Sequence, residues 1–121
     1  MSSDQTLDDI LKNLLASIPE VIAAAIVSVE GLPIASAMPA DVDETRLAAM
    51  TAAILSLGER AAQELDKGTL EQVFVRGRNG YILTMAAGPN AVLTISTTKD
   101  IKLGLVFLDT KRTCDKISKL V

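Results

Sequence analysis

Hydrophobic and polar residues along the chain switch between a helical and a strand-like period, and each switch marks a new element. The first helix is predicted from apolar residues at three- and four-residue spacing, namely Leu7, Ile10, Leu11, Leu14, Leu15 and Ile18. Its start is predicted at Thr6, because Thr6 and Asp9 fit a capping box. Pro19 is expected to end it.

A hairpin is predicted next. Residues 21–29 are rich in β-branched residues, which favours a strand, and residues 32–37 form the shorter returning strand. Glu30 and Gly31 supply a tight turn in which Gly31 takes a positive φ. Pro33 has no amide hydrogen to donate, so the returning strand is expected at an edge of the sheet.

A long central helix follows the hairpin. Asp41 is the expected N-cap, with Glu44 three residues later in the favourable first turn. Lys67 and Gly68 form the expected end of the helix.

Three strands and a closing helix complete the chain. The strands are predicted at residues 69–76, 81–87 and 91–97, and the Asn79-Gly80 pair favours a primed hairpin turn between the first two. A second capping box at residues 97–100 predicts the start of the closing helix. Its apolar stripe comprises Leu103, Val106, Phe107, Thr110, Cys114, Ile117 and Val121.

The predicted order is therefore α-β-β-α-β-β-β-α. It indicates an α+β fold in which a five-stranded antiparallel sheet is flanked by helices, within one domain of residues 1–121. These signals leave open the strand order between the hairpin and the three-strand meander.

The central helix is apolar on two sides. The side with large residues is expected to lie on the sheet, and it comprises Leu47, Met50, Ile54, Leu57, Ala61 and Leu65. The other side carries Ala48, Ala49, Ala52, Ala53 and Ser56. These small residues either favour close packing against a second copy about a two-fold axis, or serve as helix formers that face solvent. If strand 69–76 lies at an edge of the sheet, it offers a second route, because its unpaired backbone groups could continue the ladder into a second copy.

Composition and charge narrow the function. The chain is 49% hydrophobic with a net charge of −3, and no basic patch interleaved with aromatic residues predicts nucleic-acid binding. Its longest apolar run, residues 21–27, is far shorter than the ~20 residues that span a bilayer. The acidic, polar N-terminus does not fit a secretory signal. We therefore expect a soluble, cytoplasmic protein without membrane insertion.

Reactive side chains are scarce. The chain has no histidine and one cysteine, so no catalytic triad, zinc site or internal disulfide is expected, and Cys114 is predicted to be buried. The acidic pairs Asp8-Asp9 and Asp43-Glu44 are explained by helix starts. The glycine-containing loops lack the phosphate-binding pattern. No catalytic residue, cofactor or metal is expected.

Four motifs follow one another along the chain: VIAAAIVSVEGLPIAS at residues 21–36, GERAAQEL at 58–65, GYILTMAAGPNAVLTIST at 80–97 and LGLVFLDTKR at 103–112. Taken in this order, they resemble the roadblock/dynein light chain domain family in its prokaryotic form. The resemblance implies a roadblock/longin/profilin-like fold that pairs through its central helices and adjoining edge strands. It also implies a non-catalytic platform for Ras-like small GTPases or dynein components.

Carried onto this chain, the resemblance gives candidate residues for two surfaces. The homodimer interface would use the alanine side of the central helix and strand 69–76, with Ala48, Ala49, Ala52, Ala53, Ser56, Gln72, Phe74 and Arg76. A partner-binding rim would comprise Arg46, Glu59, Arg60 and Gln63. Arg60 is interpreted as part of a rim or cross-dimer ion pair, with a catalytic arginine finger as the alternative.

The leading hypothesis is therefore a homodimeric scaffold or regulator of a Ras-like small GTPase, which could stimulate hydrolysis by arranging the partner's own catalytic groups. A small-molecule sensor is the first alternative and would need a polar group inside an apolar pocket. A structural subunit of a motor or filament assembly is the second.

Overall fold

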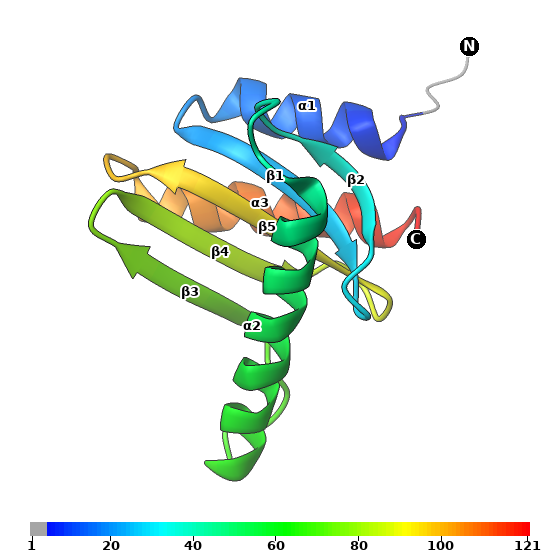
Figure 1. The fold of residues 1–121 in the computed structure, drawn as a ribbon, viewed down its shortest axis with the longest axis vertical. Coiled ribbons are helices and arrows are strands. Elements are labelled where there is room, and N and C mark those ends of the chain that lie inside the picture. The colour runs from blue at the N-terminus through cyan, green and yellow to red at the C-terminus, as the bar shows by residue number, and fades with distance from the viewer. Residues whose placement is uncertain (1–4) are drawn as a thin grey trace.

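The structure is a computed structural model that describes residues 5–121 (Figure 1). Residues 1–4 of the predicted domain lie outside the described residues. The elements are α1 Leu7–Ser17, β1 Val21–Ser28, β2 Pro33–Ala37, α2 Glu44–Glu64, β3 Gln72–Gly77, β4 Gly80–Ala86, β5 Ala91–Thr98 and α3 Leu103–Ser118. The predicted order and the α+β class are confirmed.

The five strands form one antiparallel sheet in the order β2-β1-β5-β4-β3. Pairing of β1 with β5 joins the hairpin to the meander, which the sequence pattern left open. The two edges are β2 and β3. The edge position predicted from Pro33 is therefore confirmed, and the strand predicted at residues 69–76 also lies at an edge.

Helices cover both faces of the sheet unequally. In Figure 1, α1 and α3 lie on one face, whereas α2 crosses the other face alone and projects beyond β3. The main core lies between the sheet and the α1–α3 pair. Its fully buried members include Leu11, Ile26, Leu83, Leu93, Ile95 and Ile117.

The start of α1 is as predicted. The Asp9 amide donates to the Thr6 hydroxyl at 3.1 Å, and the Thr6 amide donates to the Asp9 carboxylate at 3.2 Å. The backbone and side-chain hydrogen bonds from Thr6 lower the pKa of Asp9, because they stabilise its charged form. The capping box therefore fixes where the chain enters the fold.

The predicted starts of the other two helices are wrong. Asp43, not Asp41, caps α2, since its carboxylate accepts from the Arg46 amide at 3.2 Å after a turn over residues 39–42. No side chain caps α3, whose N-cap is Lys102. Pairing with Gly80 extends β5 to Thr98, so residues 97–98 belong to the sheet and cannot begin a helix.

The hydroxyl of Thr110 provides a test of core packing. Its Oγ1 is buried on α3 without a hydrogen-bond partner. Since an unsatisfied buried hydroxyl costs ~1–3 kcal/mol, Thr110→Val is expected to raise the free energy of unfolding in urea by about 1 kcal/mol. The matched control is Thr113→Val, which removes a 2.7 Å hydrogen bond to the Asp109 carbonyl and should give no gain. Equal destabilisation by both changes would contradict the assignment.

Candidate interaction surface

Helix α2 lies on the sheet through its small residues. Ala48 and Thr51 are buried, and they begin a stripe that continues at three- and four-residue spacing through Leu55, Gly58 and Ala62. At Gly58 the helix passes so close to β3 that an added Cβ would lie 2.9 Å from the Val73 Cγ2 atom. Small side chains are therefore required where α2 crosses the sheet.

The predicted orientation of α2 holds at Leu47, which packs with Ala25 and Val27, and is wrong for most of the other large residues. Of the large residues expected to lie on the sheet, Leu57 is 68% exposed and Met50 is 48% exposed. Leu47 and Ile54 are half-buried along one flank of the helix. The error has a physical cause, because close approach of a helix to a flat sheet selects for small size over hydrophobicity.

The α2 residues predicted at a dimer interface divide into two that pack within the chain and three that are exposed. Ala48 is 1% exposed and packs with Ala25 and Val27 of β1, so it cannot contact a second copy. Ala52 is half-buried, and a Cβ added at Gly31 would lie 3.1 Å from its Cβ atom. The three that remain exposed are Ala49, Ala53 and Ser56.

Strand β3 supplies an open edge. It pairs with β4 alone, so its outer backbone groups have no strand partner among the described residues. The predicted residues Gln72, Phe74 and Arg76 are exposed on this strand. Phe74 is anchored from within its own chain, with ring centroids 5.2 Å from Tyr81 and 5.5 Å from Phe107.

The predicted rim residues are all at the surface, namely Arg46, Glu59, Arg60 and Gln63. Arg60 pairs with Glu64 one helical turn later, at 3.5 Å and with both side chains highly exposed. Glu64 was not predicted as this partner, although its four-residue spacing from Arg60 is typical of such a pair. Exposed pairs of this kind contribute little stability, which leaves Arg60 able to exchange partners.

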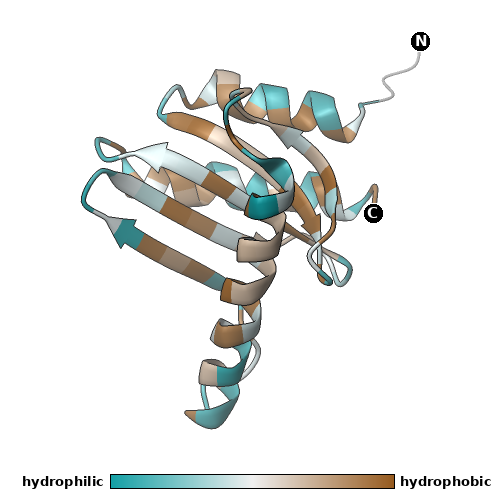
Figure 2. Ribbon diagram, viewed as in Figure 1, coloured by the Kyte–Doolittle hydropathy of each residue, from teal (hydrophilic) through white to brown (hydrophobic). Residues whose placement is uncertain are grey.

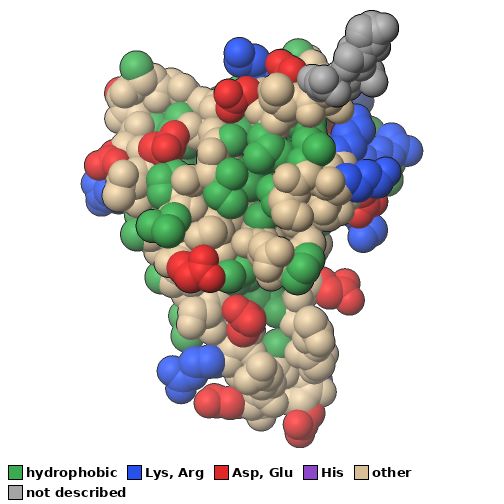
Figure 3. Space-filling model, turned by 90° about the vertical axis from the view of Figure 1, so that its right-hand side faces the viewer, with side chains coloured by type: hydrophobic (Ala, Val, Ile, Leu, Met, Phe, Trp, Pro, Cys, Tyr) green, Lys and Arg blue, Asp and Glu red, His purple; other side chains and the backbone are tan. Residues whose placement is uncertain are grey.

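Apolar and charged side chains are separated on the surface. Figure 2 shows hydrophobic residues on α2 and on the strands beside it, with hydrophilic residues at the end of α2. Figure 3 shows an apolar centre on another face, with Lys and Arg gathered at one border. The exposed large hydrophobic residues near α2 include Met50 and Leu57 on the helix and Phe74 and Val75 on β3.

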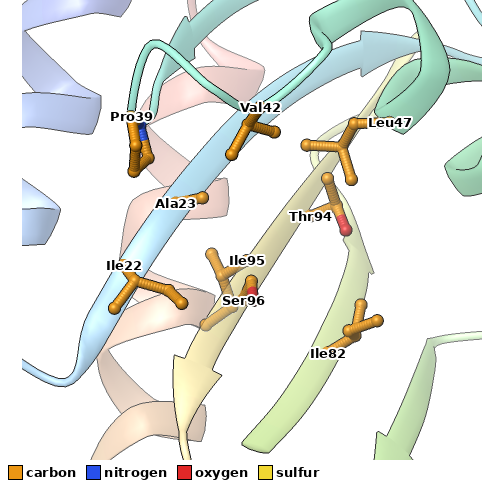
Figure 4. A pocket seen from close by; sticks show the side chains of 9 residues that line it. All are labelled: Ile22, Ala23, Pro39, Val42, Leu47, Ile82, Thr94, Ile95 and Ser96. Atoms are coloured by element: carbon orange, nitrogen blue, oxygen red, sulfur yellow. The ribbon is translucent and has the colours of Figure 1, made fainter.

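A cavity of about 160 Å³ lies where α2 leaves the sheet uncovered. Figure 4 shows side chains from three strands, from the loop before α2 and from the start of α2 around it, and none is charged. Two of the lining residues, Ser96 and Thr94, carry hydroxyl groups. The Thr94 Oγ1 atom lies 3.2 Å from the Thr84 Oγ1 atom. The lining residues are Ile22, Ala23, Pro39, Val42, Leu47, Ile82, Thr94, Ile95 and Ser96. Sequence reasoning missed this cavity, because its walls are far apart along the chain.

No cluster of three or more His, Cys, Asp or Glu residues that could hold a metal occurs between residues 5 and 121. Cys114 is buried as predicted, and desolvation raises the pKa of its thiol to about 12, which keeps it unreactive. No helix among these residues is long and apolar enough to cross a membrane.

The described residues thus place an exposed apolar helix face beside an open edge strand. The chain belongs to the Roadblock/LC7 domain family, whose pattern matches residues 7–97. Two uncharacterized proteins of Methanocaldococcus jannaschii are 38% and 37% identical to it over 95 residues, which make up 78% of this chain and 82% of each relative. The predicted family is therefore confirmed.

Solved structures show the same fold. The Roadblock/LC7 domain from Streptomyces avermitilis superimposes with a TM-score of 0.88 at 18% identity, covering 93% of this chain and 95% of that one. Myxococcus xanthus MglB gives 0.88 at 22% identity, covering 98% and 97%. Acanthamoeba castellanii profilin II gives 0.69 at 14% identity, covering 95% and 98%. The expected roadblock and profilin-like architecture is thus confirmed.

Proposed function

We propose that this protein is a non-catalytic, homodimeric scaffold that binds a Ras-like small GTPase. The observation that carries the proposal is the exposed apolar face of α2 beside the open edge of β3, in a domain of the Roadblock/LC7 family. We call this the outer α2 face, and it comprises Ala49, Met50, Ala53, Leu57 and Ala61.

The dimer interface that we propose differs from the sequence-based set. The outer α2 face replaces Ala48 and Ala52 with Met50 and Leu57, and it keeps Ala49 and Ala53, with Ser56 beside them. Two copies of this face can pair about a two-fold axis, because a surface on one element is self-complementary when the helices run antiparallel. Edge strand β3 would meet its twin in the same arrangement and complete the open ladder.

The partner-binding part of the proposal uses the charged rim of α2. Arg46, Glu59, Arg60 and Gln63 are exposed around the outer α2 face, so they stay accessible at the border of a dimer. Arg60 and Glu64 form an exposed pair that can exchange partners, which supports a role for Arg60 in docking. Any stimulation of hydrolysis would then come from ordering the GTPase's own groups.

Binding to the Ras-like GTPases encoded in the same genome tests this function. Each GTPase would be loaded with GDP or a non-hydrolysable GTP analogue and titrated into the protein by calorimetry. We expect one of them to bind at least tenfold more tightly in one nucleotide state, and Glu59→Lys combined with Arg60→Glu to weaken that binding at least tenfold. The matched control reverses Lys12 and Asp8 on α1, across the sheet. Absence of binding by every GTPase would overturn the proposal.

The sensor hypothesis has one observation in its favour. The cavity beside α2 is apolar and contains the Ser96 hydroxyl, which are the features that a small-molecule site requires.

A further inference from the structure

The cavity beside α2 lies away from the β3 edge. Its floor comes from β1, β5 and β4, and its wall is formed by Pro39, Val42 and Leu47 (Figure 4). Ile22 is 49% exposed at its border, so the opening continues into apolar surface.

Pairing through β3 would leave this cavity open. Helix α2 passes over β3 at Gly58, and six helical residues, 59–64, remain beyond that point. Six residues at ~1.5 Å each extend about 9 Å, which is less than two strand spacings of ~4.8 Å. The helix of a second copy would therefore pass β3 and end before β4, short of β5 and β1.

The volume of the cavity is suited to a single apolar side chain. Its volume of about 160 Å³ is close to that of an engineered apolar cavity of ~150 Å³ that binds benzene. A helix or a strand could not enter it, whereas one aromatic ring or one branched aliphatic group fits.

The loop beside the cavity is acidic. Asp41 lies between the lining residues Pro39 and Val42, and Asp43 and Glu44 follow directly. All three carboxylates are exposed, and Arg46 is the nearest cation along the chain. A basic segment would therefore be attracted to this opening, and an acidic one repelled.

We propose that the cavity binds one aromatic or branched apolar side chain of a partner protein, presented on a basic segment. The proposal rests on the proposed function only in assigning the occupant to a partner protein. It concerns a surface separate from the dimer interface.

Three acetylated, amidated tripeptides provide the test: Lys-Phe-Lys, Lys-Ala-Lys and Glu-Phe-Glu. Each would be titrated into the methyl-labelled full chain, with the resonances of Ile22 and Ile82 followed by NMR. We expect Lys-Phe-Lys to shift these resonances saturably, and the other two peptides to bind at least fivefold more weakly. Ser96→Leu fills the cavity and should weaken Lys-Phe-Lys binding at least tenfold. Ser17→Leu, the same change on exposed α1, should leave it unchanged, and amide spectra check that both variants fold.

The other outcomes overturn the proposal in distinguishable ways. Equal binding of Glu-Phe-Glu and Lys-Phe-Lys would show that the bound side chain need not lie on a basic segment. Binding of toluene without any peptide would assign the cavity to a free small molecule, as the sensor hypothesis requires. Unchanged methyl resonances with all ligands would show that the cavity binds no apolar group. None of these results depends on a GTPase, so a failed GTPase titration leaves this test intact.

Discussion

Replacing Leu57 with arginine is expected to convert a dimer of this chain into a monomer. Leu57 is 68% exposed at the centre of the outer α2 face, where antiparallel helices would bring the two copies of the residue close together. The substitution would bury two like charges without partners, and it should weaken self-association at least a hundredfold, or ~3 kcal/mol. The mass measured by light scattering after size exclusion should then fall from about twice the chain mass of 12.8 kDa to that mass.

The matched control is Leu105→Arg. Leu105 is 52% exposed on α3, across the sheet from α2, so the same change of side chain should leave the dimer intact. Ala52→Arg would be a poorer test, because Ala52 packs against the turn at Gly31 and a bulky residue there would disturb the fold. A dimeric Leu57→Arg variant would remove the outer α2 face from the interface. A monomeric wild type would remove the homodimer itself.

The elements themselves could be predicted because their signals are local. The capping box at Thr6, the turn at Gly31 and the proline at an edge strand each depend on residues only a few positions apart. The strand order needed a contact between β1 and β5, which are far apart in the chain and carry no pattern that selects each other.

The orientation of α2 could not be predicted from hydrophobicity. Its buried stripe is smaller and less apolar than its exposed one, since Thr51 and Gly58 lie on the sheet while Met50 and Leu57 face outward. A single chain normally buries its most apolar side. The exposed leucine and methionine are therefore expected to pack against a partner. The sequence pattern led to the same expectation from the neighbouring alanines, of which Ala48 and Ala52 instead pack within the chain.

The conformation of the β3–β4 turn also differs from the one that the local sequence predicts. The Asn79-Gly80 pair predicted a primed turn, yet Arg78 and Asn79 form the turn and neither has a positive φ. Gly80 instead begins β4, pairing with both Gly77 and Thr98. The glycine is needed for a close approach and not for the turn itself.

Gly80→Ala is therefore expected to destabilise the fold strongly. A Cβ at this position would lie 2.1 Å from the Thr97 carbonyl oxygen, which is backbone and cannot move aside without breaking the β4–β5 pairing. We expect the free energy of unfolding to fall by about 3 kcal/mol, at the upper end of single substitutions. Urea unfolding followed by circular dichroism, with all variants at one protein concentration, measures this change.

Gly104→Ala separates this clash from a general effect of removing glycine. Gly104 lies near the start of α3 with no atom within 4 Å of an added Cβ, so alanine should stabilise the helix by up to ~1 kcal/mol. Because β4 holds the edge strand β3 in place, Gly80→Ala should also lower the dimer fraction before the chain unfolds. An unchanged urea midpoint for Gly80→Ala would show that β4 and β5 do not approach each other closely at Thr97. It would then remove the support that positions β3 for pairing with a second copy.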